Sequence, residues 1–186
     1  MLDIADFQLA SLEKKDLELI LKWRNTKEIR SVMYEDHQIK IDEHIKWYEK
    51  LKMDDTKVAR LLIYKEKPIG FVNFIKINEM NQTCYWGFYI GEKQSVKRAG
   101  TVLGLLALDY IFKTKDINKV CAEIIESNRI SFNFHQKLGF QEDGRYEDYI
   151  YRDNDYIDVI IMTLSREQWA ERKEAIKKEL VGENNE

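Results

Sequence analysis

The chain has 186 residues, of which 44% are apolar, 34% are charged and 12% are aromatic. This length fits one domain with a sizeable core, and the aromatic content excludes an intrinsically disordered or low-complexity protein. Lys and Arg number 30 against 33 Asp and Glu, for a formal net charge of −3. This balance excludes the strongly basic surface that is typical of nucleic-acid binding.

The two cysteines, Cys84 and Cys121, lie in separate apolar runs. This spacing fits two buried thiols in a reducing compartment, and neither a disulfide framework nor a metal site of the zinc type. No apolar stretch approaches the roughly 20 residues of a membrane span, and no basic lead-in of a signal peptide opens the chain. We therefore expect a cytoplasmic protein that contacts no membrane.

The first third of the chain predicts one strand and two helices. Apolar and polar residues alternate over 2–10, which is the period of a strand. Apolar residues at helical spacing follow over 17–25, where Asp16 is placed to cap the helix. The same spacing returns over 41–51, with Asp42 as the expected N-cap.

Three strands are predicted next, over 58–64, 69–77 and 84–90. The first two form a hairpin, whose turn contains Pro68, the only proline of the chain. Gly87 lies inside the third run and indicates a bulge or a close backbone approach.

A polar, basic loop over 91–100 then leads into an apolar helix over 101–114. The near-continuous apolar run over 119–125 predicts a strand that is buried on both faces. Residues 127–140 predict a helix, and Gly139 is a suitable residue to end it.

Two more strands are predicted near 145–152 and 156–164. Ser165 and Gln168 form a capping box that opens the last helix. The tail over 181–186 should fray.

This order of elements predicts a single α/β (α+β) domain over residues 1–180. Two strand–helix steps, over 84–114 and 119–138, imply parallel neighbours. We expect a mixed, mostly antiparallel sheet of six or seven strands with helices on both faces.

The loop at 91–100 has the properties of an anion site. Unpaired backbone N–H groups and the helix dipole favour negative charge at a helix N-terminus, and Lys93, Lys97 and Arg98 add formal charge. The alternative interpretation is a solvated basic loop.

The segment Ser95–Thr101 also resembles the cofactor loop of the GNAT acetyltransferase superfamily, whose members transfer acetyl from acetyl-CoA to an amine. Gly100 matches a glycine of that loop, whereas Ser95 and Arg98 depart from its pattern. The resemblance implies a GNAT-like fold with acetyl-CoA bound at the end of a strand and by the backbone amides that follow it. The implied residues are Phe88, Tyr89, Ile90, Val96, Lys97, Arg98, Ala99, Gly100 and Thr101.

A second motif of the superfamily runs from Asn128 to Phe140. The resemblance implies that Asn128 and Ser131 bind the cofactor near its pantetheine arm. His135 stands where many members have the tyrosine that protonates the leaving thiolate. A protonated histidine can serve as such a donor, and the alternative is a surface histidine.

The N-terminal half is similar to one branch of the superfamily, the PseH-type N-acetyltransferases of pseudaminic acid biosynthesis. These enzymes acetylate the 4-amine of a UDP-linked dideoxy-amino sugar. The resemblance, together with the need to neutralise a diphosphate and to stack a base, gives a set of expected substrate-binding residues. They are Arg24, Asn25, Met33, Tyr34, His44, Trp47, Asn73, Lys76 and Tyr89, although for each aromatic residue taken alone a place in the core is the more common outcome.

Attack by an amine on a thioester requires a base. Glu123 is a lone glutamate in an apolar run, and such a residue is paired, solvated or functional. We expect it to take the proton of the amine, directly or through water. A backbone N–H near 87–90 is the expected oxyanion donor.

Two other functions remain open at this point. The chain also fits a ribosomal-protein-type N-terminal acetyltransferase, whose acceptor is a peptide end, and a non-catalytic CoA-binding module. A homodimer is a further expectation.

Overall fold

The computed structural model describes residues 2–182 and contains one seven-stranded sheet in the order β1-β2-β3-β4-β5-β7-β6. The strands are β1 (Phe7–Ser11), β2 (Val58–Tyr64), β3 (Lys67–Asn78), β4 (Thr83–Ile90), β5 (Lys119–Ile125), β6 (Gln141–Arg152) and β7 (Asp155–Ser165). The helices are α1 (Leu17–Arg24), α2 (Lys27–Arg30), α3 (Ile41–Lys52), α4 (Ala99–Thr114), α5 (Arg129–Leu138) and α6 (Arg166–Gly182), with short 3-10 helices at Ile4–Asp6 and Lys14–Asp16.

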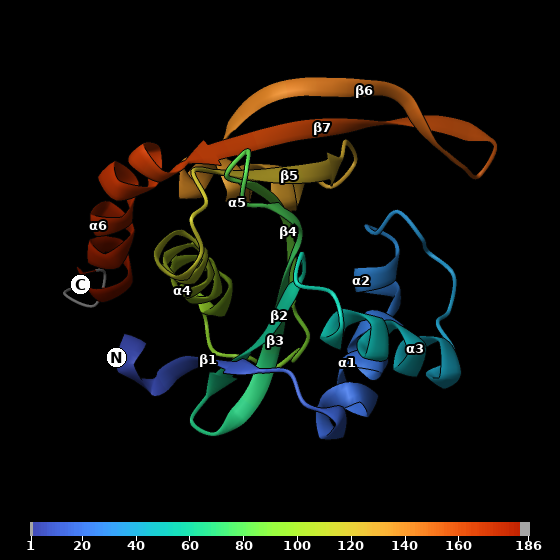
Figure 1. Ribbon diagram of the computed structural model, residues 1–186, viewed down its shortest axis with the longest axis horizontal. Coiled ribbons are helices and arrows are strands. Elements are labelled where there is room, and N and C mark those ends of the chain that lie inside the picture. The colour runs from blue at the N-terminus through green and yellow to red at the C-terminus, as the bar shows by residue number, and fades with distance from the viewer. Residues whose placement is uncertain (1, 183–186) are drawn as a thin grey trace.

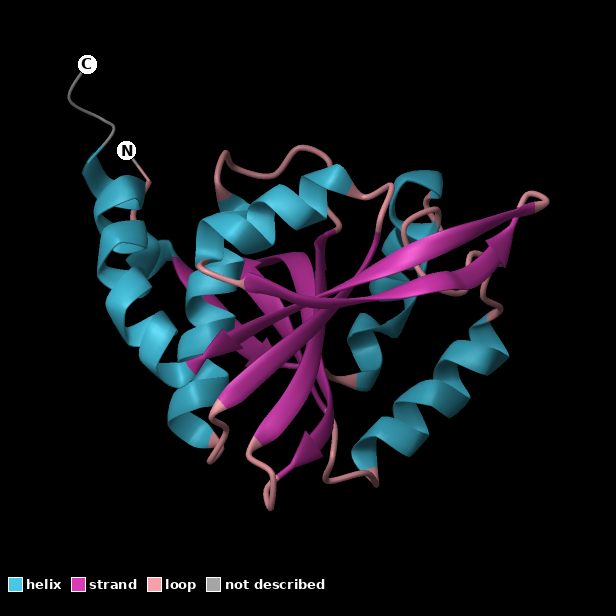
Figure 2. Ribbon diagram, turned by 90° about the horizontal axis from the view of Figure 1, so that it is seen from above, coloured by secondary structure: helices cyan, strands magenta, loops and turns pink. Residues whose placement is uncertain are grey.

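The sheet separates two layers of helices. Helices α4 and α6 pack on one face and α1–α3 on the other (Figures 1 and 2). Neighbouring residues of β2 and β3 point to opposite faces, so Leu62 and Val72 join the large core under α4, while Leu61 and Phe71 pack with Trp23 of α1. No helix within residues 2–182 is both long and apolar enough to cross a membrane.

The pairing of β4 with β5 positions the site. It is the parallel pair of the sheet and covers three residue pairs, from Thr83–Lys119 to Tyr85–Cys121. Beyond Tyr85 the two strands separate, because β4 stays paired with β3 and β5 with β7. The separation leaves backbone groups of both strands unpaired along a wedge-shaped gap.

Much of the predicted fold is confirmed. The mixed, mostly antiparallel sheet with helices on both faces is present, and β2 and β5 have the predicted bounds. The capping box is present too: Ser165 N–H donates to Gln168 Oε1 at 2.8 Å, and Gln168 N–H to Ser165 Oγ at 3.1 Å. Gly139 ends α5 with a φ of 98°.

Several local predictions are wrong. A 3-10 helix replaces the first half of the predicted strand over 2–10. Asp16 is the N-cap residue of α1 as predicted, but its side chain accepts from Glu13 N–H instead of making a cap bond. Lys40 rather than Asp42 is the N-cap of α3. Gly87 forms no bulge, although its predicted close contact exists: a Cβ there would lie 3.1 Å from Asn73 Oδ1.

The second strand–helix step gives no parallel neighbours, because β7 lies between β5 and β6 and runs antiparallel to both. Strand β5 is also not buried on both faces: Cys121 and Glu123 are half-exposed on one side. Cys84 is buried, so one of the two predicted buried thiols is confirmed. In the predicted tail, Val181 and Gly182 belong to α6, and 183–186 lie outside the described residues.

Candidate active site

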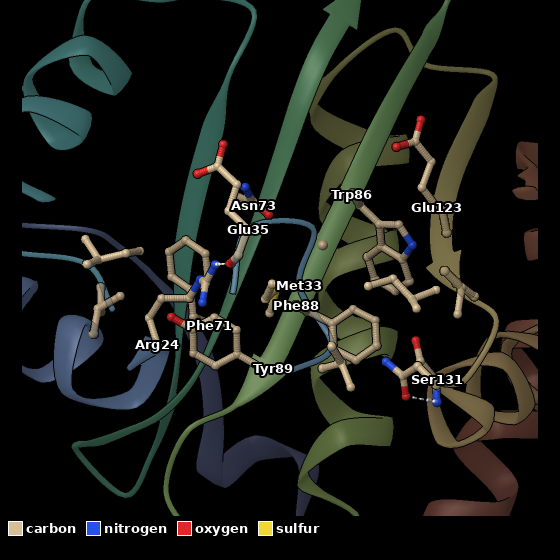
Figure 3. Close-up of a pocket in the computed structure, with 18 of the residues that line it drawn as sticks. Arg24, Met33, Glu35, Phe71, Asn73, Trp86, Phe88, Tyr89, Glu123 and Ser131 are labelled. Carbon is tan, nitrogen blue, oxygen red and sulfur yellow. Dashed lines mark hydrogen bonds between the residues drawn. The ribbon is translucent and has the colours of Figure 1, made fainter. Parts of the chain in front are cut away.

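A cavity of about 350 Å³ lies where β4 and β5 separate. Its walls come from β3, β4, β5 and α5 on one side, and from α1, α3 and the segment between them on the other (Figure 3). Eleven of the residues expected at the site line it: Arg24, Met33, His44, Trp47, Asn73, Phe88, Tyr89, Glu123, Asn128, Ser131 and His135.

The cavity wall holds unsatisfied polar atoms. Within residues 2–182, the buried side-chain nitrogens that lack a hydrogen-bond partner are Arg24 Nη1, His44 Nε2 and Trp86 Nε1. All three residues line this cavity. Because buried polar groups are almost always hydrogen-bonded, the gathering of three exceptions here indicates a site whose ligand supplies the partners.

Arg24 presents a positive charge to the cavity. Its Nη2 donates to the backbone oxygen of Glu35 at 2.7 Å, as Figure 3 shows, while Nη1 is left over. Burial lowers the pKa of Arg24, but a guanidinium keeps its charge in proteins. The free donor is therefore suited to an anionic or carbonyl oxygen of a ligand.

Aromatic rings continue this wall. His44 stacks on Trp47 at 5.0 Å between ring centroids, and Phe71 stacks on Tyr89 at 5.3 Å. Burial lowers the pKa of His44, so its ring is neutral at pH 7. A hydrogen bond to the Leu17 backbone uses one ring nitrogen and leaves Nε2 as an acceptor.

Glu123 lies across the cavity on β5. The hydroxyl of Tyr34 donates to Glu123 Oε2 at 2.6 Å. Burial and this bond raise the pKa of Tyr34, so the phenol keeps its proton. Among residues 2–182, Glu123 Oε1 accepts no hydrogen bond and is available to a ligand.

His135 is 3% exposed and lies among aromatic rings, at 4.9 Å from Phe140 and 5.5 Å from Trp86. Its Nδ1 lies 2.7 Å from the backbone oxygen of Ser131 and donates to it in the neutral ring. Burial lowers the pKa of His135 to about 4. The expected protonated donor therefore does not fit, and neither does a surface histidine.

The loop before α4 fits the expected pyrophosphate site through its backbone. The N–H groups of Val96, Lys97, Gly100 and Thr101 donate to no other described residue. A Cβ on Gly100 would make only ordinary contacts, at 3.8 Å from Phe134 and 4.0 Å from Ile90. Open amides and free space at a helix N-terminus suit a close anionic ligand.

The charge of this loop is smaller than expected. Lys93 pairs with Glu28 at 2.9 Å, and Arg98 Nη1 donates to the backbone oxygen of Glu179 at 2.8 Å. Two of the three expected cations therefore have protein partners, and the groups that the loop offers to an anion are mainly backbone amides.

Three expected substrate residues do not line the cavity: Tyr34, which bonds with Glu123, and Asn25 and Lys76. Asn25 bonds with both backbone groups of Ile39, at 2.8 and 2.9 Å. Lys76 lies 4.5 Å above the ring of Tyr85, where a bulge with a φ of 51° breaks the strand alternation. The cavity also contains residues that the sequence analysis missed, namely Glu35, Glu43, Phe71 and Trp86.

Glu35 and Glu43 lie with His37 in an exposed group whose ligand atoms come within 4.8 Å of one another. Exposed acidic groups often gather in this way without an ion. The group does not by itself make a metal site.

A parallel strand pair that separates, followed by open amides at a helix N-terminus, is the arrangement that an acyl-CoA-dependent acyltransferase requires. Residues 7–141 match the Acetyltransferase (GNAT) domain, and the chain belongs to this family. GNAT acetyltransferases use acetyl-CoA, so the protein is an acetyl-CoA-dependent N-acetyltransferase that acts on an amine. This result sets aside the non-catalytic CoA-binding module.

Proteins similar to this chain carry different names. The acetyltransferase PseH of Campylobacter jejuni is 30% identical over 129 residues, which are 69% of this chain and 79% of that protein. The spermidine N(1)-acetyltransferase of Vibrio cholerae is 25% identical over 168 residues, 89% of this chain and 96% of that one. A Vibrio cholerae spermidine N-acetyltransferase in complex with CoA and spermine superposes with a TM-score of 0.83 at 24% identity, over 89% of this chain and 99% of that chain, which shows the shared fold.

Proposed function

We propose that the enzyme acetylates the 4-amino group of a UDP-linked dideoxy-amino sugar. The observation that carries this proposal is the unpartnered Nη1 of Arg24 in the cavity wall. A buried guanidinium donor requires an acceptor, and a diphosphate oxygen supplies a charge-assisted one. The PseH relative supports the same substrate class.

The rest of this wall suits the other parts of such an acceptor. The rings of Trp47, Phe71 and Tyr89 form a continuous series, with Trp47 at 6.2 Å from Phe71, and offer faces on which a uracil stacks. Asn73 offers polar atoms to the sugar and Met33 an apolar surface to its methyl group. Nε2 of His44 accepts from a hydroxyl or N–H group.

Acetyl-CoA supplies the thioester. The amides over 96–101 hold its pyrophosphate, and Asn128 and Ser131 lie beside its path at the start of α5. Glu123 takes the proton of the amine on Oε1, while Tyr34 occupies Oε2. The edge of β4 beyond Tyr85, which faces no strand, offers backbone N–H groups to the developing oxyanion.

A polyamine is the second candidate acceptor. Three carboxylates line the same cavity, those of Glu35, Glu43 and Glu123, and a relative is named for spermidine. The charge of Arg24 opposes this candidate, because it repels a polycation in the same space. A peptide N-terminus stays the third candidate, and a homodimer stays a prediction.

Steady-state acetylation of four acceptors tests the proposal. They are the UDP-4-amino sugar, the same amino sugar without its nucleotide, spermidine, and a peptide with a free N-terminus. We expect the UDP-sugar to have the highest kcat/KM, and this value to fall by about 10- to 150-fold without the diphosphate, the value of one charge-assisted hydrogen bond. A higher kcat/KM for spermidine or the peptide would refute the proposal.

The Glu123→Gln variant tests the base. We expect kcat to fall by about 10²- to 10⁴-fold, the usual contribution of a positioned base. Acetyl-CoA should still raise the melting temperature of this variant as it does for the unaltered enzyme, because the cofactor loop is unchanged. An unchanged kcat would remove Glu123 from the mechanism.

A further inference from the structure

The segment over 31–40, between α2 and α3, forms one wall of the acceptor cavity without regular secondary structure. Met33 and Glu35 of this segment face the cavity (Figure 3). Such a segment has few backbone hydrogen bonds of its own, and its carbonyl groups need other partners to hold one conformation.

Arg152, at the end of β6, supplies most of these partners. Its Nη1 donates to the backbone oxygen of Ser31 at 2.8 Å, and its Nη2 to those of Met33 at 2.6 Å and Tyr34 at 3.0 Å. Its Nε pairs with Asp36 at 3.2 Å. One side chain thus fixes four residues of a segment that lies more than 110 residues away in the sequence.

The burial of Arg152 shows that this contact is specific. Only 13% of its side chain is exposed, whereas every other residue of β6 except Ile150 is exposed. Strands β6 and β7 reach past β5 on the side of α2 (Figure 1), so no core explains a buried arginine there. The guanidinium matches the carbonyl groups of the segment instead.

A bulge in β6 adds a second contact. The register of β6 and β7 shifts between Tyr146 and Ile150, and Asp148 takes a φ of 51° while its N–H donates to Asp158 at 2.9 Å. The bulge brings the ring of Tyr149 to 6.1 Å from that of Tyr34. Bulges beside active sites commonly redirect a side chain in this way.

We propose that Arg152 is a positioning residue for acetyl transfer. It fixes the backbone of residues 31–36, and the fixed backbone keeps the hydroxyl of Tyr34 on Glu123 Oε2, so that Oε1 faces the amine. The inference rests on the proposed role of Glu123 as the base and does not depend on which amine is the acceptor.

A double-mutant cycle of Arg152→Met and Tyr34→Phe tests the inference. The assay uses whichever amine the unaltered enzyme acetylates fastest, so a wrong substrate class leaves the test intact. We expect each single variant to lower kcat by about 10- to 100-fold, the value of a hydrogen bond to a charged group. The double variant should be no slower than the slower single variant, because both changes remove the same support of Glu123. The KM for acetyl-CoA should change less than about twofold, since the cofactor loop is untouched.

Arg166→Met is the matched control. Arg166 Nε donates to the backbone oxygen of Ile117 at 2.9 Å, beyond the opposite end of β5 from the site. This control should lower the melting temperature and leave kcat unchanged. If Arg152→Met folds poorly, Arg152→Lys keeps the charge beside Asp36 and should recover part of the lost kcat.

Two results would overturn the inference: losses that multiply in the double variant, or an Arg152→Met variant whose kcat matches that of Arg166→Met. Failure of the underlying mechanism is seen separately, as an unchanged kcat in Glu123→Gln. Tryptic cleavage after Arg30 and Lys40 gives a structural readout, and it should accelerate in Arg152→Met alone.

Discussion

Replacing Arg24 by Met should separate substrate binding from stability. Arg24 makes one hydrogen bond, to the backbone oxygen of Glu35, and leaves Nη1 buried without a partner. Met has a similar length and fills most of the same space, but it has neither charge nor donor. The substitution therefore removes the guanidinium that we assign to the diphosphate and leaves the packing of α1 in place.

The substitution should change the KM for the UDP-sugar strongly and the free energy of unfolding little. In the complex, a lost charge-assisted hydrogen bond costs about 1.5–3 kcal/mol, which raises the KM for the UDP-sugar by about 10- to 150-fold. In the free protein, the lost bond to Glu35 is offset by the relief of a half-buried charge. We expect the free energy of unfolding to change by less than about 1 kcal/mol, which for a chain of this size is about 2–4 °C in Tm.

Steady-state kinetics with the UDP-sugar and with its nucleotide-free analogue, alongside thermal unfolding, measure both quantities. The KM should rise for the UDP-sugar only. Arg60→Met is the control, because Arg60 also donates to a backbone oxygen, that of Ala59 at 2.9 Å, and to Tyr110 at 2.8 Å, away from the cavity. It should lower Tm and leave KM unchanged. An unchanged KM in Arg24→Met, or an equal rise for both acceptors, would refute the reasoning.

Two further predictions concern the cofactor half of the site. Gly100→Ala should stabilise the free protein by up to about 1 kcal/mol, because alanine favours a helix and its Cβ meets only ordinary contacts at 3.8 and 4.0 Å. The same Cβ occupies the space over the open amides, so acetyl-CoA should give a smaller rise in Tm than in the unaltered protein. For His135, the pKa falls from its ordinary value of 6.5 to about 4, so the unfolded chain binds the proton first on acidification. The contribution of His135 to the free energy of unfolding is complete above about pH 6.5 and is lost towards pH 4, in total about 3 kcal/mol. In His135→Phe, the free energy of unfolding measured in urea should therefore vary less with pH by that amount.

The sequence predicted best where one local signal decides the structure. The apolar runs over 58–64 and 119–125 became strands with those bounds, since no competing pattern overlaps them. The cap of α3 was assigned two residues too late, because Asp42 is a stronger capping residue than Lys40 on propensity alone.

Eleven of the residues expected at the site line one cavity, whereas the surroundings of several of them differ from the expectation. His135 lines the cavity, but its protonation depends on its burial beside the ring of Trp86 from β4 and that of Phe140, which follows α5. Lys76 was assigned from the resemblance and from the charge that a diphosphate requires, but a bulge at this position places its amine over the ring of Tyr85, outside the cavity. Trp86 was missed because a tryptophan inside an apolar strand has the pattern of a core residue, and only its unpartnered Nε1 distinguishes it.

The two halves of the site are held in different ways, and this difference bears on how substrates diverge within the fold. The half that we assign to the cofactor is built on β4, β5 and α4, whose buried side chains belong to the large core. The acceptor half depends on the irregular segment over 31–40, which side chains of Arg24, Asn25 and Arg152 attach to the rest of the protein. Changes in that segment alter the acceptor wall without disturbing the core, because few apolar contacts depend on it. A fold of this kind keeps one acetyl donor while its acceptor changes, and the chain is accordingly similar both to the acetyltransferase PseH and to a spermidine N(1)-acetyltransferase.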